Sequence, residues 1–367
     1  MICSLGCLLL PPATLRADEA ARKIQLGTWA RGITVGPGMD ASGRILRDCI
    51  FIGLDLRNAD LDGASLDGCT IYQCDLRNAT FRDAIFSGCI WEKCNIGGAD
   101  FTDAAIDGYR SLHSITSAIR LTTRQVVSTR NYKSKCLRNC IIAIADDSRE
   151  GLPAPELDFR LGNLEDATFV SVDLTRCDFT DAIITGMDVN GGRIDFGQIA
   201  STKSYKERDL RGVGFGGIPV KGQWNLSGLN LTGAKFNGSG LLLGADLTDA
   251  IISGCFFRCS LTPRQIYDTR NYQEGNLPNV RFWNIDLRGA DFAGMELSGC
   301  EFEECDLTNA SFNDAVITNA RFRARGLTAA QVQATWNYRN ERMSGIQLPK
   351  EITAVLQTEK GEDPECR

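Results

Sequence analysis

A period of five residues runs without a break from Leu46 to Ile106 and limits what this chain can fold into. Every fifth position in this stretch holds a large apolar residue, and from Ala59 to Ala104 the position two places earlier holds alanine or cysteine. An amphipathic helix needs apolar residues at a period of about 3.6, and a strand at a period of about 2. The pattern therefore fits neither element as a continuous segment. The large residues are Leu46, Phe51, Leu56, Leu61, Leu66, Ile71, Leu76, Phe81, Phe86, Trp91, Ile96, Phe101 and Ile106.

The small residues add a second, longer period. They follow the order Ala, Ala, Cys, Cys, so that the pattern repeats after twenty residues. A coil that turns a corner every five residues has four sides and satisfies both periods. We expect the large side chain of each five to fill the axis, and the small one to lie against the wall, where a bigger group would overpack. Successive coils would stack at the spacing of strands, roughly 4.8 Å, and form a solenoid.

Several five-residue units resemble a known motif. The segments Ala59–Gly63, Ala64–Gly68, Asn78–Asp83 and Ala99–Asp103 are similar to the A-(D/N)-L-x-x motif of the pentapeptide-repeat family. The resemblance implies an all-β solenoid, a right-handed quadrilateral β-helix of pentapeptide repeats. It indicates the fold and does not by itself identify a function.

A different segment interrupts the repeat four times, and each copy has a Gln, then a Thr, then a Tyr at fixed spacing. In three copies a Leu-Thr pair precedes the Gln, as in Leu121 and Thr122 before Gln125. Thr followed three places later by Gln is a capping box, and Pro263 falls at a first helical position. We expect short helices that pack on the solenoid wall; the alternative is a docking element. The copies are Gln125–Tyr132, Gln198–Tyr205, Gln265–Tyr272 and Gln331–Tyr338.

These patterns predict the organisation of the chain. Residues 1–17 form a possible signal peptide, and 18–45 form an N-terminal cap region in which Ala20–Trp29 is expected to be a short helix over the first coil. Residues 46–322 form the β-helix, and 323–367 form a C-terminal helical cap and polar tail. The helical inserts are expected near 121–133, 198–206 and 261–273.

The 15 cysteines are compatible at first sight with disulfides or metal sites, but nine of them occupy the small inward position. A thiol there behaves as a small apolar residue, so we predict that these nine are buried thiols. The spacing of Cys69 and Cys74 is that of the repeat rather than a zinc motif. Cys136 and Cys140 lie outside the long registers and are the exception. The nine are Cys49, Cys69, Cys74, Cys89, Cys94, Cys177, Cys255, Cys300 and Cys305.

The N-terminal residues bear on location. An apolar run, Ile2–Leu10, is followed by Pro11 and Pro12, and cleavage after Ala17 would resemble processing of a signal peptide. The run is too short to span a membrane. We therefore expect export, to the periplasm, the extracellular space or the cell surface; the alternative is a cytoplasmic protein with an intact Met1.

No residue stands out as catalytic, cofactor-binding or metal-ligating. The net charge of −6 is spread along the chain and does not favour a nucleic-acid binder, and the single histidine, His113, disfavours a histidine-based site. The many Asp residues occupy turn positions, where they stabilise corners. We expect a non-enzymatic scaffold or protein-interaction module that needs no cofactor and binds another protein through a flat face. The alternative is a DNA mimic that binds a type II topoisomerase such as DNA gyrase, as some members of the resembled family do.

Overall fold

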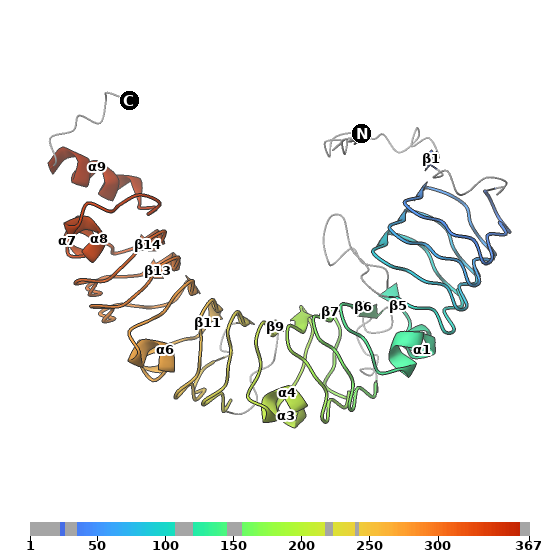
Figure 1. The fold of residues 1–367 in the computed structure, drawn as a ribbon, viewed down its shortest axis with the longest axis horizontal. Helices are drawn as coiled ribbons and strands as arrows, with labels where there is room; N and C mark the ends of the chain where they lie inside the picture. The colour runs from blue at the N-terminus through green and yellow to red at the C-terminus, as the bar shows by residue number, and fades with distance from the viewer. Residues whose placement is uncertain are drawn as a thin grey trace, which may run out of the picture.

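A computed structural model describes residues 23–25, 35–106, 120–144, 156–216, 223–238 and 242–359. The chain winds into a curved solenoid, and its two ends rise on the same side of the arc (Figure 1). Each coil has four sides, because four positions per coil pair with the next coil: Ile50 with Thr70, Asp55 with Asp75, Asp60 with Thr80 and Ser65 with Ile85. The predicted four-sided β-helix is therefore confirmed.

One side of most coils is a short strand, and these strands stack into two sheets, in parallel except where β1 pairs with β2. The first sheet has the order β1-β2-β3-β4, and the second runs from β14 back to β5. The first contains β1 (Lys23–Gln25), β2 (Ile50–Ile52), β3 (Thr70–Tyr72) and β4 (Ile90–Glu92). The second contains β5 (Arg120–Leu121), β6 (Ile141–Ile144), β7 (Thr168–Val170), β8 (Asp188–Asn190), β9 (Gly214–Gly216), β10 (Lys235–Gly238), β11 (Phe256–Cys259), β12 (Arg281–Trp283), β13 (Glu301–Asp306) and β14 (Arg321–Arg325).

Large side chains fill the axis as the period of five predicts. Leu56, Phe81 and Phe302 are all buried, at 2%, 0% and 0% exposed. From β9 to β14 one phenylalanine per coil stacks on the next, with ring centroids 5.0 to 5.9 Å apart. Stacked rings bury large apolar areas and add attraction of their own. The stack consists of Phe215, Phe236, Phe257, Phe282, Phe302 and Phe322.

Cysteines in the small inward position are more than apolar fillers. Eight of the nine are buried, and Cys94 is half-buried. Several thiols donate a hydrogen bond to a carbonyl of the preceding coil, as Cys69 Sγ does to Leu46 O at 2.6 Å and Cys300 Sγ to Leu277 O at 2.8 Å. The thiol thus fits the small space and also ties two coils together. Cys136 is exposed and Cys140 buried, and no disulfide joins them.

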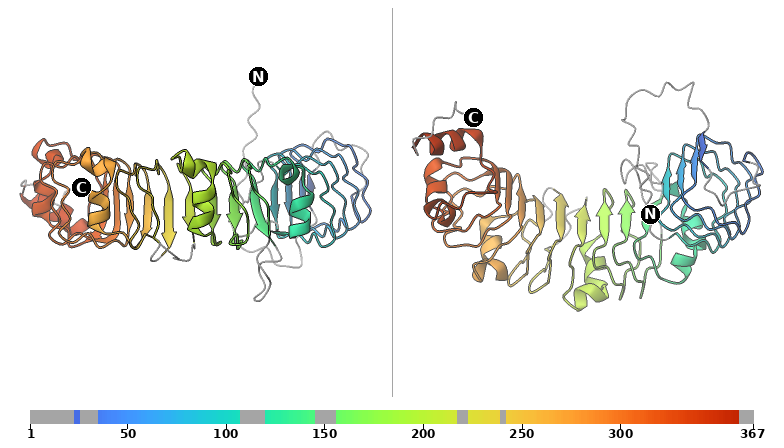
Figure 2. Two further views of the ribbon diagram at one scale, coloured as in Figure 1. Left: turned by 90° about the horizontal axis from the view of Figure 1, so that it is seen from below. Right: turned by 45° about the horizontal axis from the view of Figure 1, so that its top comes forward.

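The four interrupting segments are helical inserts, as predicted, and they lie on the outer side of the arc while the strands line the inner side (Figures 1 and 2). Each insert consists of two short helices joined at a buried threonine, such as Thr269. The pairs are α1 (Thr123–Ser128) with α2 (Arg130–Lys133), α3 (Phe196–Ser201) with α4 (Lys203–Lys206), α5 (Pro263–Tyr267) with α6 (Arg270–Gln273), and α7 (Ala329–Gln333) with α8 (Trp336–Arg339).

The glutamine of each insert joins the helix to the coil beneath it. Gln265 Oε1 accepts a hydrogen bond from the N–H of Thr262, and this closes the expected capping box. Its amide nitrogen donates to the carbonyls of Leu242 and Ala245, at 2.7 and 2.9 Å. In a regular coil the carbonyl at the place of Ala245 accepts from the next coil, as the carbonyl of Ala59 accepts from the N–H of Thr80. The glutamine side chain therefore supplies the donor that Ala245 would otherwise lack. Gln125, Gln198 and Gln331 do the same.

A buried polar residue in the second helix supplies an acceptor. Asn337 is fully buried, and its Oδ1 accepts from the N–H of Ile317 at 2.6 Å. In the second insert Ser204 holds this place, and its hydroxyl accepts from the N–H of Ile184 at 2.9 Å. The inserts therefore continue the hydrogen bonding of the stack, which supports the structural interpretation of these segments.

The two ends of the solenoid are covered differently. The prediction of a helix over Ala20–Trp29 is wrong for Lys23–Gln25. These residues form β1, which pairs antiparallel with β2. The free edge of β2 offers unpaired backbone groups, and an added strand satisfies them where a helix would not. At the other end, α9 (Lys350–Glu359) buries Ile352 and Leu356 against Val332.

Several expectations fall on residues outside the described ranges. They are the signal peptide at 1–17, its cleavage after Ala17, and the environment of His113. The division of the chain into domains at 17, 45 and 322 stays a prediction.

Replacing Asn337 tests the role of the inserts. We expect Asn337→Ala to lower the free energy of unfolding by about 1–3 kcal/mol, because the buried N–H of Ile317 loses its acceptor. Asn337→Ser should recover most of this loss, since Ser204 performs the same task in the second insert. Urea unfolding followed by circular dichroism measures both. Equal stability of the alanine variant and the wild type would contradict the argument.

The buried thiols should resist alkylation. Burial raises the pKa of Cys89 and of Cys300 to about 12, and the thiolate is the reactive form. We expect iodoacetamide at a pH of about 8 to modify the exposed Cys136 in the folded protein, and to modify Cys89 and Cys300 only after denaturation. Peptide mass spectrometry over time gives the rates. Modification of Cys89 as fast as Cys136 would show that the coils open readily.

Candidate functional surfaces

The inner side of the arc carries a patch of arginine and aromatic side chains on β11 to β14. In each of these strands one phenylalanine points into the axis, so the residues on either side of it point away from the core. The strands line the inner side of the arc (Figure 1), so the side chains that point away from the core face that side. They form two columns, because the strands are in register.

The first column begins with an aromatic ring and continues with charged residues of alternating sign. Phe256 is paired with Arg281, Arg281 with Glu301, and Glu301 with Arg321. The Arg281 guanidinium lies 4.7 Å from the centroid of the Phe256 ring, which is a cation–π distance. Glu301 and Arg321 are at 4.0 Å, the limit of an ion pair.

The second column repeats the arrangement. The Arg258 guanidinium lies 5.7 Å from the centroid of the Trp283 ring. The next residue in the column is Glu303, whose carboxylate lies 3.9 Å from Arg321 and 3.8 Å from Arg323. A hollow of about 530 Å³ lies beside Trp283. Its other lining residues are Asn237, Gly238, Arg258, Cys259, Ser260, Asn284 and Glu304.

We call Phe256, Arg258, Arg281 and Trp283 the concave patch. Its two cations are held over rings, and within the described residues neither Arg258 nor Arg281 has a carboxylate at ion-pair distance. The sequence contains the signal, since arginine and aromatic residues flank the inward phenylalanine in Phe256–Cys259 and Arg281–Trp283. Sequence reasoning missed the patch because the paired residues of β11 and β12 are 25 positions apart, with the third insert between them. That these strands are neighbours is visible only in the folded structure.

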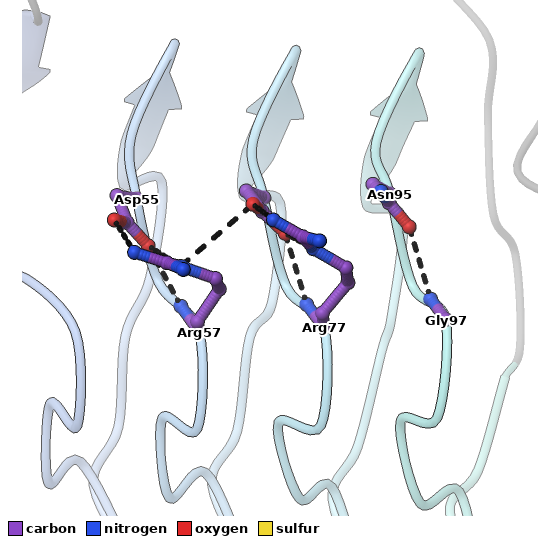
Figure 3. Close-up of polar contacts among 6 residues, drawn as sticks. Asp55, Arg57, Arg77, Asn95 and Gly97 are labelled. Atoms are coloured by element: carbon purple, nitrogen blue, oxygen red, sulfur yellow. Dashed lines mark hydrogen bonds and ion pairs between the residues drawn. The ribbon is translucent and has the colours of Figure 1, made fainter.

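A second surface feature is a ladder of aspartate and arginine on another side of the first block (Figure 3). Asp55 accepts from Arg57 at 2.9 and 2.8 Å, and Asp75 accepts from Arg77 at 2.9 and 2.7 Å. Arg57 also lies 3.9 Å from Asp75, which joins the two rungs. In the third coil Asn95 and Gly97 replace the pair, and Asn95 Oδ1 accepts only from the backbone N–H of Gly97, at 3.1 Å.

The ladder neutralises the carboxylates that it contains. The Arg77 guanidinium holds the pKa of Asp75 below its usual value, and the same two-residue spacing recurs in later coils. There the Arg288 guanidinium lowers the pKa of Asp286 to about 2. The acidic turn positions of this chain are therefore, at many coils, ion pairs rather than bare negative charges. The other pairs of this kind are Asp158 with Arg160 and Asp209 with Arg211.

The described ranges show no arrangement that suits a metal, because they contain no group of three His, Cys, Asp or Glu side chains that could hold one. No helix in these ranges is long and apolar enough to cross a bilayer.

Sequence comparison detects the repeat. A family model described as pentapeptide repeats matches residues 158–192, 273–303 and 285–323, and a second pentapeptide-repeat model matches 46–112. These segments of the chain are pentapeptide repeats, as the sequence motifs and the four-sided coil indicate. No curated protein matches it in sequence.

Among solved structures, similar chains include the pentapeptide-repeat protein HetL and the resistance protein QnrB1. HetL, which is involved in heterocyst differentiation regulation in the cyanobacterium Nostoc sp. strain PCC 7120, is 14% identical over 76% of this chain and 81% of its own, with a TM-score of 0.14. QnrB1, a plasmid-mediated fluoroquinolone resistance protein, is 11% identical over 85% of this chain and 97% of its own, with a TM-score of 0.19. At these TM-scores neither likeness bears on function.

The pKa of Asp286 gives a direct test of the ladder. We expect its carboxyl to titrate near pH 2 in the folded protein, and Arg288→Ala to raise that pKa toward, but not to, 3.8, since the backbone N–H of residue 288 still donates to it. Because folding lowers the pKa of Asp286, its carboxylate stabilises the folded protein above pH 3.8. This stabilisation is lost as the pH falls through about 2. Carbon NMR of labelled aspartate measures the titration, and Asp246, which is bonded to Thr248, serves as the unaffected control.

Proposed function

We propose that this protein is a non-catalytic scaffold that binds another protein through the concave patch. The observation that carries the proposal is the pair of guanidinium groups held over Phe256 and Trp283 on the inner side of the arc. Tryptophan and arginine are enriched among the residues that contribute most to protein–protein affinity. A patch built from them on an ordered sheet suits binding rather than turnover.

The patch is organised before a partner arrives. Its side chains stand on strands whose inward neighbours, Phe257 and Phe282, are fully buried in the stack. The rings hold the guanidinium groups in place, so little side-chain freedom is lost when a partner docks. The hollow beside Trp283 can receive a side chain of the partner.

Charge indicates which kind of partner fits. Arg321 and Arg323 are paired with Glu301 and Glu303, whereas no carboxylate of the described residues lies at ion-pair distance from Arg258 or Arg281. Carboxylates from a partner can satisfy these two guanidinium groups, and arginine suits such contacts because its donors match carboxylate geometry. We therefore infer an acidic segment on the partner.

The alternative of a DNA mimic that binds a type II topoisomerase has less support. A mimic of the DNA backbone needs rows of uncompensated negative charge, and here the aspartates of the ladder are paired with arginine. An assay of DNA gyrase supercoiling with the purified chain tests this alternative, and inhibition at stoichiometric amounts would favour it over the proposal above.

Affinity capture with matched variants tests the proposed function. We expect the full chain to retain a partner from a lysate of its own cells, and Arg258→Ala with Trp283→Ala to reduce the recovery about tenfold or more, as losing interface hot spots does. Arg264→Ala, on an exposed arginine of the third insert, should leave recovery unchanged. Quantitative mass spectrometry gives the recoveries, and circular dichroism confirms that each variant is folded.

A partner that is lost with Arg264→Ala and retained by the patch variant would place the binding surface on the inserts and overturn the proposal.

A further inference from the structure

The two arginines of the concave patch occupy opposite corners of a small square. Arg281 is paired with Phe256 across β11 and β12, and Arg258 lies over Trp283 of the same two strands. Each column therefore contains one ring and one cation, in opposite order. With a rise of about 3.3 Å per residue and about 4.8 Å between strands, the Cα atoms of the two arginines lie about 8 Å apart.

The cations are on top of the rings and accessible. Phe256 and Trp283 are half-buried, whereas Arg258 and Arg281 are exposed. A guanidinium that rests on a ring still carries its N–H donors around its edge, where an acceptor can reach them. The patch thus presents two sets of charged donors that the rings hold in place.

The chain's own carboxylate on the β13 side does not neutralise this charge. Glu301 is the residue paired with Arg281 in the sheet, but the Arg281 guanidinium lies over Phe256, on the opposite side of its strand. Glu301 instead lies 4.0 Å from Arg321. The charge of Arg281 is therefore left for a group from outside the chain.

The β10 side is neutral as well. Asn237 is the residue paired with Arg258, and it carries no charge. The other outward residue of β10, Lys235, forms an ion pair with Asp188 at 3.1 Å. Positions 239–241, which follow β10 in the sequence, contain no acidic residue. The uncompensated charge in this part of the sheet is therefore limited to two guanidinium groups.

Two adjacent cations match one doubly charged group. A phosphate monoester has a charge of about −1.5 to −2 at neutral pH and three strong acceptor oxygens, so it can accept from both guanidinium groups at once. One carboxylate carries a single charge and leaves one cation uncompensated. Arginine clusters are a recurring means of recognising phosphorylated segments.

The surroundings disfavour a larger polyanion. A nucleic acid that followed the columns would meet Glu301 and Glu303 in the next strand, on a chain whose net charge is −6. A lipid bilayer is flat over this distance, whereas the patch lies on the inner side of the arc (Figure 1). A single phosphate on a polypeptide meets neither obstacle.

We propose that the concave patch recognises a phosphoserine or phosphothreonine of its protein partner, with the phosphate held between Arg258 and Arg281. The proposal rests on the proposed function and adds which group of the partner is recognised. Because the guanidinium groups are exposed at the surface, a short side chain is long enough to bring its phosphate between them.

Retention of labelled peptide pools on the immobilised full chain tests this recognition. Each pool has randomised positions on either side of a fixed centre, which is phosphoserine, serine or a pair of glutamates. At a pH of about 7.5, where the phosphate is mostly doubly charged, we expect the phosphoserine pool to be retained about tenfold or more above the other two. Fluorescence of the eluted label measures the retention.

Matched variants place the phosphate. Arg258→Ala with Arg281→Ala should reduce retention of the phosphoserine pool to that of the serine pool. Arg264→Ala, on an exposed arginine of the third insert, should leave it unchanged. Asn237→Asp places a carboxylate beside Arg258 without removing either arginine, and we expect it to lower the retention while the melting temperature stays unchanged.

Two results would overturn the proposal. Equal retention of the phosphoserine pool and either of the other pools would show that phosphate is not what the patch recognises. A preference for phosphoserine that persists in the double arginine variant would place the phosphate elsewhere. Neither result decides the proposed function, because capture of an unphosphorylated partner through the patch would still be measured by the lysate experiment with Arg258→Ala and Trp283→Ala.

Discussion

Each coil of this solenoid depends on the backbone hydrogen bonds that join it to the next coil. The N–H of Phe81 donates to the carbonyl of Asp100 at 2.8 Å, and the same step recurs along the stack. These bonds lie around an apolar axis, so a coil that stops short leaves sheltered donors and acceptors without partners, at a cost in free energy. Any interruption of the repeat must therefore replace the bonds that it removes.

The helical inserts meet this requirement with side chains. A glutamine supplies donors to the carbonyls of the coil beneath, and Asn337 or Ser204 supplies an acceptor to a buried N–H. That an amide and a hydroxyl serve equally at equivalent places shows that the requirement is for an acceptor and not for one residue type.

The proposed binding surface occurs where outward positions depart from the repeat. Outward side chains contribute little to the stack, so they are free to vary without loss of the fold. Trp283 and the arginines around it occupy such positions on the inner side of the arc.

The sequence by itself determined the four-sided coil, the residues of its axis and the places of the helical inserts, because these follow from spacings of five and from capping boxes, which are local. The sequence predicted a helix where β1 forms. This prediction was wrong because the pairing of β1 with β2 joins residues that are far apart in the chain. Only the tertiary structure decided that Arg258 lies over Trp283, and Arg281 over Phe256. Such neighbours depend on how the inserts shift one coil against the next, and no local spacing records that shift.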